Sequence, residues 1–425
     1  MSILINLINL LASHSHRIPS ITMNYFTAAQ AAEHLGVSLQ TLYAYVSRGL
    51  LHAEPGKTHR ERRYRAADVE RLAAQRTRGR KPKEVAKAAL DWGMPVLESA
   101  ITLIEDGRCY YRGRDALAMA ETASVEATAA WLWQCDETSA FAVDAGDSVR
   151  QMARDWPVML LERYRDTRAE VALLPTFTVV SDDAATAIWQ RDPLRVAQGS
   201  AALLRAMTAC LLGMLPSSAP IHEQCADAWG VKDAEGADLI RMVLVLCADH
   251  ELNASSFTAR CVASTGASLR AAIIAGLSAL TGGRHGGTTA RNEAMWEEVG
   301  ETDVANRMRD RLARGEKLPG FGHHLYPAGD VRASAMLARV LPAHPAWQTM
   351  IDAADALVGQ RPSLDFALVA VRRHLGLPLG AAFGLFALGR TIGWIAHARE
   401  QRESTQLIRP RAAYVGVRPE AVAPD

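Results

Sequence analysis

The sequence lacks three features that would mark its class at once: paired cysteines, a strong net charge and a long uncharged run. Its six cysteines form no C-x-x-C pair, which argues against a disulfide framework or a zinc ribbon and predicts a reducing, cytoplasmic compartment. Lys and Arg (47) nearly balance Asp and Glu (46), so the whole chain exerts no long-range pull on nucleic acid or anionic membrane. No stretch reaches the roughly 18 uncharged residues that a membrane helix needs.

Two common nucleotide-binding folds are excluded as well. The chain has no alternating series of strands and helices and no Gly-rich loop after a strand, so dinucleotide-binding and P-loop classes do not apply. What is present is the ordinary balance of a globular protein, with 49% hydrophobic and 22% charged residues. At 425 residues the chain exceeds the usual size of a single hydrophobic core, which predicts two or three domains.

Ala and Leu recur at helical spacing over most of the chain after residue 92, which predicts a mainly α-helical protein. Strand signals are few. We expect a hairpin from Val96–Leu103 and Cys109–Tyr111 around the turn Glu105-Asp-Gly107, and another short strand at Thr176–Val180. The segments with a clear helical pattern are 201–212, 237–246, 271–280 and 381–396.

The N-terminal part differs in composition from the rest. Residues 1–22 begin apolar but lack the positively charged region of a signal peptide, so we expect a disordered or mis-assigned start, with Met23 opening the protein. Residues 48–83 hold twelve Lys or Arg against four acidic residues, and such an asymmetry marks a domain boundary. Clustered like charges with Gly and Pro in Arg78–Lys83 indicate an exposed linker. We expect a small domain over 23–76 and a basic linker over 77–91.

The small domain carries a helix-turn-helix spacing. Thr27 can cap a short helix, Gly36-Val-Ser38 interrupts it, and Ser38 caps a second helix that runs to Ser47. Arg60–Arg65 would form a basic wing, and 67–72 a further helix. The stretch from Tyr25 to Gln75 resembles the winged helix-turn-helix modules of the MerR and excisionase type.

This resemblance leaves two uses open for the module. If it binds DNA, the second helix enters the major groove while the wing meets phosphates; otherwise the module only docks onto its neighbour. The candidate DNA-binding residues are Gln40, Thr41 and Tyr43 on the second helix, and Arg60, Arg62, Arg63 and Arg65 in the wing.

Four segments place polar side chains inside otherwise apolar helical sequence, where burial is costly unless the groups are paired or used. Histidines in three of them could suggest a metal site. However, His250, His285, His323 and His324 do not have the H-x-x-x-H or H-E-x-x-H spacing that presents two ligands on one helical face, so we expect no metal. The segments are 248–255, 281–287, 319–326 with 330–332, and 362–366.

In this order the four segments resemble the citrate synthase family. Its D-H-x-x-N-A-S, G-x-x-H-G-G, P-G-[FY]-G-H and L/V-D-F motifs stand here at 249–255, 282–287, 319–323 and 364–366. Residues 388–397, 408–414 and Tyr111-Arg-Gly113 are similar to further segments of the family, so the resemblance spans about 92–416. It implies a mainly α, two-domain fold behind the winged module. The large domain would cover 92–284 plus 378–425, and an inserted small domain 285–377.

The resemblance also implies an activity. Citrate synthases are acyltransferases (EC 2.3.3.-) that condense acetyl-CoA with oxaloacetate and hydrolyse citryl-CoA to citrate and CoA at the entry of the tricarboxylic acid cycle, without a metal or bound cofactor. Asp365 matches the family's base, His285 the donor to the enolate oxygen, and His323 the donor to the keto oxygen. Three arginines match those that hold the oxaloacetate carboxylates, with a further contact from a histidine; they are Arg332, Arg390 and Arg409, together with His250. Arg409 would come from the neighbouring subunit, which implies a homodimer or a higher even oligomer.

One departure from the family concerns CoA. Many bacterial members read G-H-R-x-Y-K, but this chain has Gly322-His-His-Leu-Tyr-Pro327, which replaces two basic residues near the expected CoA phosphates. Arg284 stands where many members carry an apolar residue and could partly compensate. The candidate CoA-binding residues are Arg284, Gly320, Phe321 and Gly322.

Two alternatives stay open. One is 2-methylcitrate synthase, which uses propionyl-CoA, because one methylene changes selectivity by only about 1 to 3 kcal/mol and can depend on a few side chains. The other is a DNA-binding regulator with a citrate synthase-like body as metabolite sensor. A pure sensor could keep the arginines and lose Asp365 and His285; both are present, which favours an enzyme.

Overall fold

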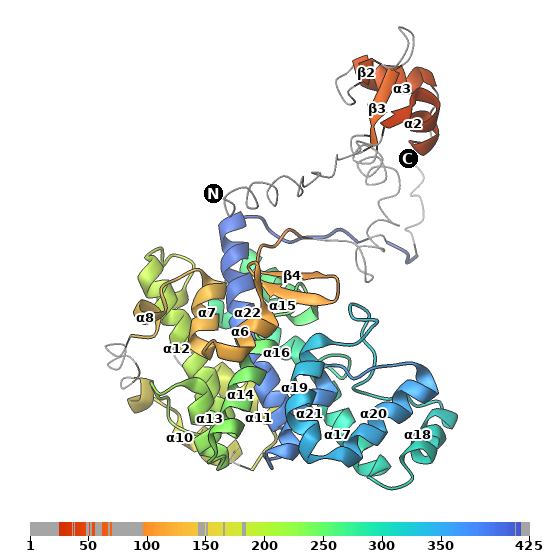
Figure 1. Cartoon of the computed structure of the whole chain (residues 1–425). Helices are drawn as coiled ribbons and strands as arrows, with labels where there is room; N and C mark the ends of the chain where they lie inside the picture. Colours follow the sequence, from red (N-terminus) through yellow and green to blue (C-terminus); the bar gives the residue numbers. More distant parts are fainter. Residues whose placement is uncertain are drawn as a thin grey trace, which may run out of the picture. The chain divides into compact units, whose positions relative to one another are not determined.

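The computed structural model of the chain forms two compact units, of which Glu98–Ala412 is the larger (Figure 1). The expected start (1–22) and the expected linker (77–91) lie outside the described residues. The structure describes residues 25–35, 37, 39–47, 51, 53–55, 62–66, 69, 97–142, 149, 152–164, 166–180, 184–412 and 414–417.

The N-terminal unit contains the two expected helices. Thr27 and Gln30 cap the first one reciprocally: the Gln30 amide donates to Thr27 Oγ1 at 3.3 Å, and the Thr27 amide donates to Gln30 Oε1 at 2.9 Å. The basic wing appears as a strand between two others, with Tyr64 fully buried beneath the helices. Arg60 and most of the helix expected at 67–72 lie outside the described residues. The elements are β1 (Tyr25–Thr27), α2 (Ala28–His34), α3 (Leu39–Ser47), β2 (Ala53–Pro55) and β3 (Arg62–Arg65), and the antiparallel sheet has the order β1-β3-β2.

The larger unit begins with the predicted hairpin. β4 (Thr102–Glu105) pairs with β5 (Arg108–Tyr111) in antiparallel register, Thr102 opposite Tyr111, and β6 (Arg114–Asp115) adds a short third strand. The two turn residues, Asp106 and Gly107, have φ values of 50° and 73°. Positive φ at both positions is the type I′ geometry that fits the twist of a two-residue hairpin.

Helices make up most of the rest of this unit, as the sequence predicts. The four segments with a clear helical pattern are found within α12, α14, α16 and α22. In the described part of the chain, no helix is long and apolar enough to cross a membrane. The α-helices are α6 (Ala116–Thr122), α7 (Val125–Trp133), α8 (Glu137–Ala140), α10 (Val158–Tyr164), α11 (Ala169–Val179), α12 (Pro193–Leu212), α13 (Ile221–Trp229), α14 (Ala234–Cys247), α15 (Ala254–Ser264), α16 (Leu269–Leu280), α17 (Thr288–Val299), α18 (Val304–Ala313), α19 (Val331–Val340), α20 (Pro345–Val358), α21 (Leu364–His374) and α22 (Ala381–Ser404), with 3-10 turns η2 (Ala184–Thr186) and η3 (Leu341–Ala343).

The strand expected at Thr176–Val180 was wrong, because all of it but Val180 lies in α11. The β-branched residues of this segment raise its strand propensity, but two threonines satisfy their hydroxyls within the helix. Thr176 Oγ1 donates to Ala172 O at 2.7 Å, and Thr178 Oγ1 donates to Leu174 O at 2.7 Å. Phe177 is fully buried in the core, so tertiary packing decides the conformation.

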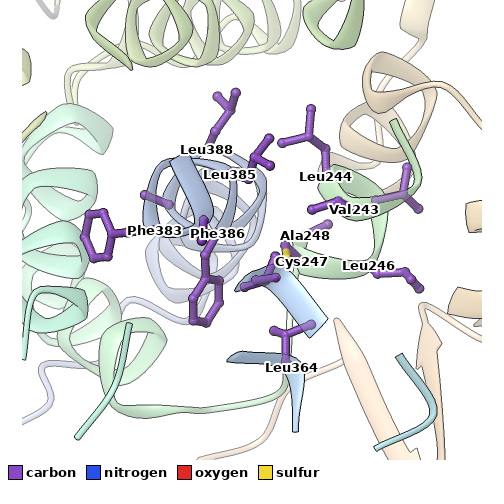
Figure 2. Packing of buried hydrophobic residues seen from close by; sticks show 14 of the residues in the cluster. Val243, Leu244, Leu246, Cys247, Ala248, Leu364, Phe383, Leu385, Phe386 and Leu388 are labelled. Atoms are coloured by element: carbon purple, nitrogen blue, oxygen red, sulfur yellow. The ribbon is translucent and has the colours of Figure 1, made fainter. Parts of the chain in front are cut away.

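The helix α22 is the central element of the larger unit. All its residues from Ala381 to Ala398 are buried, and it packs against α14, whose side chains Val243 and Leu244 lie beside it in Figure 2. Gly389 allows this close approach, because a Cβ there would lie 2.7 Å from Leu244 O and from Cys247 Cβ. The packing thus fixes the C-terminal end of α14 against the middle of α22.

The helices α17 to α21 gather on one side of this unit (Figure 1). Their pairs α19 with α21, α18 with α20 and α17 with α21 pack together, and α21 also contacts α22. The boundaries of a large domain (92–284 plus 378–425) and a small domain (285–377) stay a prediction.

Candidate active site

The turn between α14 and α15 presents His250. Asn253 caps α15, its Oδ1 accepting the amides of Ser255 and Ser256 at 3.1 Å each, while Glu251 takes a positive φ of 52°. The Tyr111 hydroxyl lies 3.1 to 3.2 Å from three carbonyl oxygens at the end of α14, those of Val245, Leu246 and Asp249. This tyrosine ties the hairpin to the turn and holds the backbone around His250.

Asp249, next to His250, lies at the centre of a buried polar group. Thr102 Oγ1 donates to Asp249 Oδ2 at 2.6 Å, and His397 Nε2 of α22 stands 3.3 Å from the same oxygen. All three side chains are buried. Burial alone would raise the pKa of Asp249, but His397, Arg390 and the Thr102 hydroxyl bring that pKa below its usual value. The carboxylate therefore stays ionised and anchors the turn to α22.

Two buried guanidinium groups face this region. Arg390 of α22 is 1% exposed, and its Nε donates to Cys247 O at 2.9 Å. Arg332 of α19 is 2% exposed and forms a two-pronged pair with Asp330, at 3.0 and 2.8 Å. Its third nitrogen, Nη1, is buried and has no hydrogen-bond partner in the protein. With Asp330 held by Nε and Nη2, Arg332 keeps Nη1 for a further carboxylate, and Arg390 supplies a second guanidinium, a pair that suits a dicarboxylate.

Three histidines lie beside these guanidinium groups. The rings of His250 and His323 meet edge-on with centroids 5.2 Å apart, and His285 meets Phe386 edge-on at 5.9 Å. Burial, followed by the nearby arginine charges, lowers the pKa of all three: to about 4 for His285 and for His323, and well below the usual value for His250. At neutral pH all three are uncharged imidazoles that can donate one hydrogen bond each.

His285 stands in a glycine-rich turn. A Cβ on Gly286 or Gly287 would lie 2.7 Å from atoms of Leu280 or Thr281, so only glycine permits this backbone path. The imidazole Nε2 is 2.8 Å from Ser255 Oγ, which fixes the ring against the first turn of α15.

Asp365 lies in the first turn of α21. Two backbone hydrogen bonds join the segment 319–323 to the residues just before α21. The Ser363 amide donates to Gly320 O and the Gly322 amide donates to Arg361 O, each at 2.8 Å. Asn292 Nδ2 donates to Asp365 O at 3.2 Å. Asp365 Oδ1 is buried without a hydrogen-bond partner in the protein, and burial raises the pKa of this carboxyl to about 7. A carboxyl that titrates near neutral pH can take up a proton from a weak carbon acid.

The structure brings six of the predicted site residues together. His250 and His323 touch through their rings, Arg390 lies over Phe386 beside His285, and Asp365 is within electrostatic reach of Arg332. Arg409, by contrast, is exposed on the segment after α22 and makes none of the contacts described for this cluster.

The remaining candidates are more scattered. Of the residues expected to bind CoA, Gly320 and Phe321 are buried beside α21, whereas Gly322 and Arg284 are exposed. In the winged module Tyr43 is 50% exposed, Thr41 and Arg63 are half-buried, and Arg62 and Arg65 are exposed. Arg65 pairs with Glu54 at 2.6 Å. Arg60 and the side chain of Gln40 lie outside the described parts.

Sequence reasoning assigned no role to several residues that now line the site or support it. They all stand inside the segments that the motifs marked, which was the available signal, but only their pairing in space shows what they do. Among the described residues, no group of three His, Cys, Asp or Glu side chains is arranged to hold a metal ion. The residues that sequence reasoning missed are Asp249, Ser255, Tyr326, Asp330 and His397.

Two models of known protein families match the chain. A model of the C-terminal domain of citrate synthase matches residues 89–411, and a model of a helix-turn-helix domain matches residues 25–77.

Individual relatives point the same way. The chain is 37% identical to citrate synthase of Haloferax volcanii over 191 residues, 42% of this chain and 50% of that protein. It is 39% identical to citrate synthase 2 of Bacillus subtilis over 183 residues (41% and 49%), and 36% identical to 2-methylcitrate synthase 1 of Corynebacterium glutamicum over 207 residues (45% and 54%). The chain spans about half the length of the curated relatives it matches.

Solved structures cover more of the chain. Citrate synthase from Thermotoga maritima matches with a TM-score of 0.62 and 25% identity, covering 78% of this chain and 96% of that one. A ternary complex of carboxymethyl coenzyme A and oxaloacetate with citrate synthase from Thermoplasma acidophilum matches with a TM-score of 0.64 and 25% identity, covering 80% and 98%.

Proposed function

The chain belongs to the citrate synthase family, and on that premise we propose that it is an acyltransferase that condenses acetyl-CoA with oxaloacetate to give citrate and free CoA. The observation that carries the proposal is the buried carboxyl of Asp365, whose Oδ1 has no hydrogen-bond partner and whose pKa is raised to about 7, beside neutral histidines and two buried arginines. Such a set combines a base, neutral hydrogen-bond donors and a dianion clamp.

In the first step Asp365 takes a proton from the methyl group of acetyl-CoA. The enolate charge that develops on the thioester oxygen needs a donor, and neutral His285 provides it through Nδ1–H. That tautomer requires the Ser255 hydroxyl to donate to His285 Nε2, 2.8 Å away. In the structure the same hydroxyl also lies 2.7 Å from Asn253 Oδ1, which accepts two backbone amides besides, so the proposed step has the hydroxyl donate to His285 in place of Asn253.

In the second step the methyl carbon bonds to the keto carbon of oxaloacetate. The keto oxygen gains the electron pair and receives a proton from His323. Arg332, through its unpaired Nη1, and Arg390 hold the two carboxylates, and His250 adds a neutral donor. Water then cleaves the thioester of citryl-CoA, which releases citrate and CoA; the proposed mechanism uses no metal and no bound cofactor.

The proposal includes a second subunit. Arg409 is exposed in its own chain, so its assigned role at an oxaloacetate carboxylate requires that it reach the site of a partner in a homodimer. For CoA we propose the backbone around Gly320, Phe321 and Gly322, next to Asp365, with exposed Arg284 as a phosphate contact.

The identity of the acyl-CoA substrate is the part of the proposal for which a specific alternative exists. A relative that is 36% identical bears the name 2-methylcitrate synthase, which uses propionyl-CoA. Steady-state release of free CoA, measured with oxaloacetate and either acyl-CoA, tests activity and selectivity at once. We expect a higher kcat/KM with acetyl-CoA. A preference for propionyl-CoA would assign the chain to this alternative, and no release with either would contradict the enzyme.

The helix-turn-helix domain supports a second candidate, a DNA-binding regulator with a citrate synthase-like sensor body. Each phosphate contact steepens the fall of log affinity with log salt by about 0.9, so replacing Arg60, Arg62, Arg63 and Arg65 by Ala should flatten that slope by about three to four. Arg62→Ala alone should change it more than Arg65→Ala, because Glu54 already pairs with Arg65. The full-length protein on duplex DNA is the material for this titration, and salt-independent or absent binding would exclude DNA.

A further inference from the structure

Tyr326 touches three of the residues that the proposed mechanism places at oxaloacetate. It is 2% exposed, and its hydroxyl lies 3.1 Å from His250 Nε2. Its ring centroid is 5.5 Å from that of His250 and 5.2 Å from that of His323, and the guanidinium of Arg332 stands 5.5 Å above it. No other tyrosine in the described part of the chain has contacts to all three of these residues.

The hydrogen bond between Tyr326 and His250 joins two uncharged groups. Burial raises the pKa of the Tyr326 phenol and lowers that of His250, so neither ionises near neutral pH. A neutral imidazole carries its proton on one nitrogen only, and the partner of the other nitrogen selects which. Control of the Tyr326 hydroxyl therefore amounts to control of the His250 tautomer.

The surroundings favour one direction for this bond. The other polar neighbour of the phenol is the thiol of Cys109, whose own pKa burial raises to about 12, so the thiol is neutral and a weak acceptor. The bare nitrogen of an imidazole is the stronger acceptor. The Tyr326 hydroxyl then donates to Nε2, and the His250 proton sits on Nδ1.

We propose that Tyr326 is a positioning residue for the dicarboxylate substrate: its hydroxyl holds the proton of His250 on Nδ1, where it serves as a donor to oxaloacetate. This inference rests on the proposed function, because His250 has its substrate role there. Tyr326 itself need not touch the reacting atoms, and its effect should appear in substrate binding more than in the chemical step.

The test compares the full-length wild type with Tyr326→Phe, which keeps the ring contacts and removes only the hydroxyl. We expect oxaloacetate affinity, measured by titration calorimetry, to fall about five- to twentyfold, as for loss of a hydrogen bond in a charged pocket. The KM for oxaloacetate should rise in parallel, while kcat at saturating oxaloacetate stays within about threefold. Tyr110→Phe, in strand β5, is the matched control and should leave the affinity unchanged.

A double-mutant cycle separates positioning from simple loss of packing. If Tyr326 acts through His250, adding Tyr326→Phe to His250→Ala should cost no further affinity. Suppose that the wild type releases CoA. Fully additive losses in the cycle, or an oxaloacetate affinity that Tyr326→Phe leaves unchanged, would then overturn only the positioning role of Tyr326. A wild type that binds oxaloacetate but releases no CoA would contradict the proposed reaction, while the binding cycle still judges Tyr326. Absence of oxaloacetate binding in the wild type would overturn both.

Discussion

Two effects shift the pKa of Asp365 in opposite directions, and the sequence alone does not show which is larger. Its position in the first turn of a helix favours the carboxylate, whereas burial favours the neutral acid. In the structure burial is the larger effect, and the pKa rises to about 7. The same reasoning at residue scale applies to the three histidines, because burial and the arginine charges keep them neutral. A site that must donate hydrogen bonds to two carbonyl oxygens, and a proton to one of them, needs neutral donors of this kind.

Asp365 should impose an acid limb on the reaction. As pH rises through about 7 the carboxyl ionises and becomes a base, so kcat/KM for acetyl-CoA should rise tenfold per pH unit below that value and level off above it. At pH 8, where the wild-type carboxyl is ionised, Asp365→Asn should lower kcat by at least about 100-fold and leave oxaloacetate affinity nearly unchanged. Turnover within threefold of the wild type would refute the assignment.

The raised pKa of Asp365 also predicts how the free energy of unfolding changes with pH. Since the unfolded carboxyl has a pKa of about 3.9, the unfolded state loses its proton first, and wild-type stability should decline between about pH 4 and 7 relative to Asp365→Asn. Thermal unfolding of both proteins at pH 4.5 and pH 8 measures this, with the variant gaining at pH 8. An equal difference at both pH values would contradict the raised pKa.

Ser255 gives a third prediction at this scale. Ser255→Ala removes the hydroxyl that fixes the tautomer of His285, and kcat should fall about three- to tenfold, with KM for oxaloacetate little changed. Ser278→Ala is the control, because that hydroxyl is exposed and bonds only within its own helix, to Ile274 O. Equal kinetics for both variants would remove Ser255 from the mechanism.

Among the elements, the contact between α14 and α22 sets the position of most of the site. α14 ends just before Asp249 and His250, and α22 carries both Arg390 and His397. The helices approach closely because Gly389 and Gly393 face the end of α14, where Cβ atoms would lie 2.7 Å from Leu244 O and 2.3 Å from Asp249 Oδ1. The two glycines of α22 thus bring Arg390 and His397 of the same helix close to Asp249 and His250, which follow α14.

Gly389→Ala should therefore destabilise the protein. The added methyl group would press on backbone and Cys247 Cβ, which cannot move away cheaply, and overpacking of this kind costs about 1 to 3 kcal/mol. Chemical denaturation should show the loss, together with weaker oxaloacetate binding. Gly283→Ala is the control for stability, because a Cβ there meets nothing within 4 Å.

The sequence predicted elements better than it predicted pairings. Helices with an Ala and Leu pattern and the hairpin at Asp106-Gly107 follow from local preferences, so they could be predicted. The segment 176–180 could not, because its β-branched residues favour a strand until Phe177 is buried in a helical core. For the site, motif order located His250, His285, His323 and Asp365. The partners Tyr326 and His397 stand 76 and 148 residues from the groups they bond, a separation that no local pattern encodes.

For the whole molecule, the central question is whether one subunit completes the site of another. Arg409 is exposed in its own chain, yet the proposed mechanism places it at a substrate carboxylate. The proposed homodimer resolves this by exchange of the segment after α22.

Mixed dimers test the exchange directly. Asp365→Asn and Arg409→Leu subunits should each be inactive or strongly impaired as pure dimers. In a mixed dimer, one site contains the intact Asp365 of one subunit and the intact Arg409 of the other, so co-expression should restore up to about half of the wild-type rate per mixed dimer. Activity no higher than the sum of the two pure variants would place Arg409 in its own subunit's site or outside any site.

The backbone hydrogen bonds between 319–323 and 361–363 join His323 and Asp365 into one rigid piece. His285 lies in the turn after α16, and Arg390 lies in α22, so neither belongs to this piece. If the two groups move relative to each other, the distance from the base to the enolate donor changes, while the distance from the base to His323 does not. Oxaloacetate is held by Arg332 on one side and Arg390 on the other. The distance between its two carboxylates would then set the distance between Asp365 and His285 at the moment when Asp365 takes the proton from acetyl-CoA. A keto dicarboxylate one carbon longer than oxaloacetate should therefore bind but leave Asp365 too far from the methyl group of acetyl-CoA to take its proton.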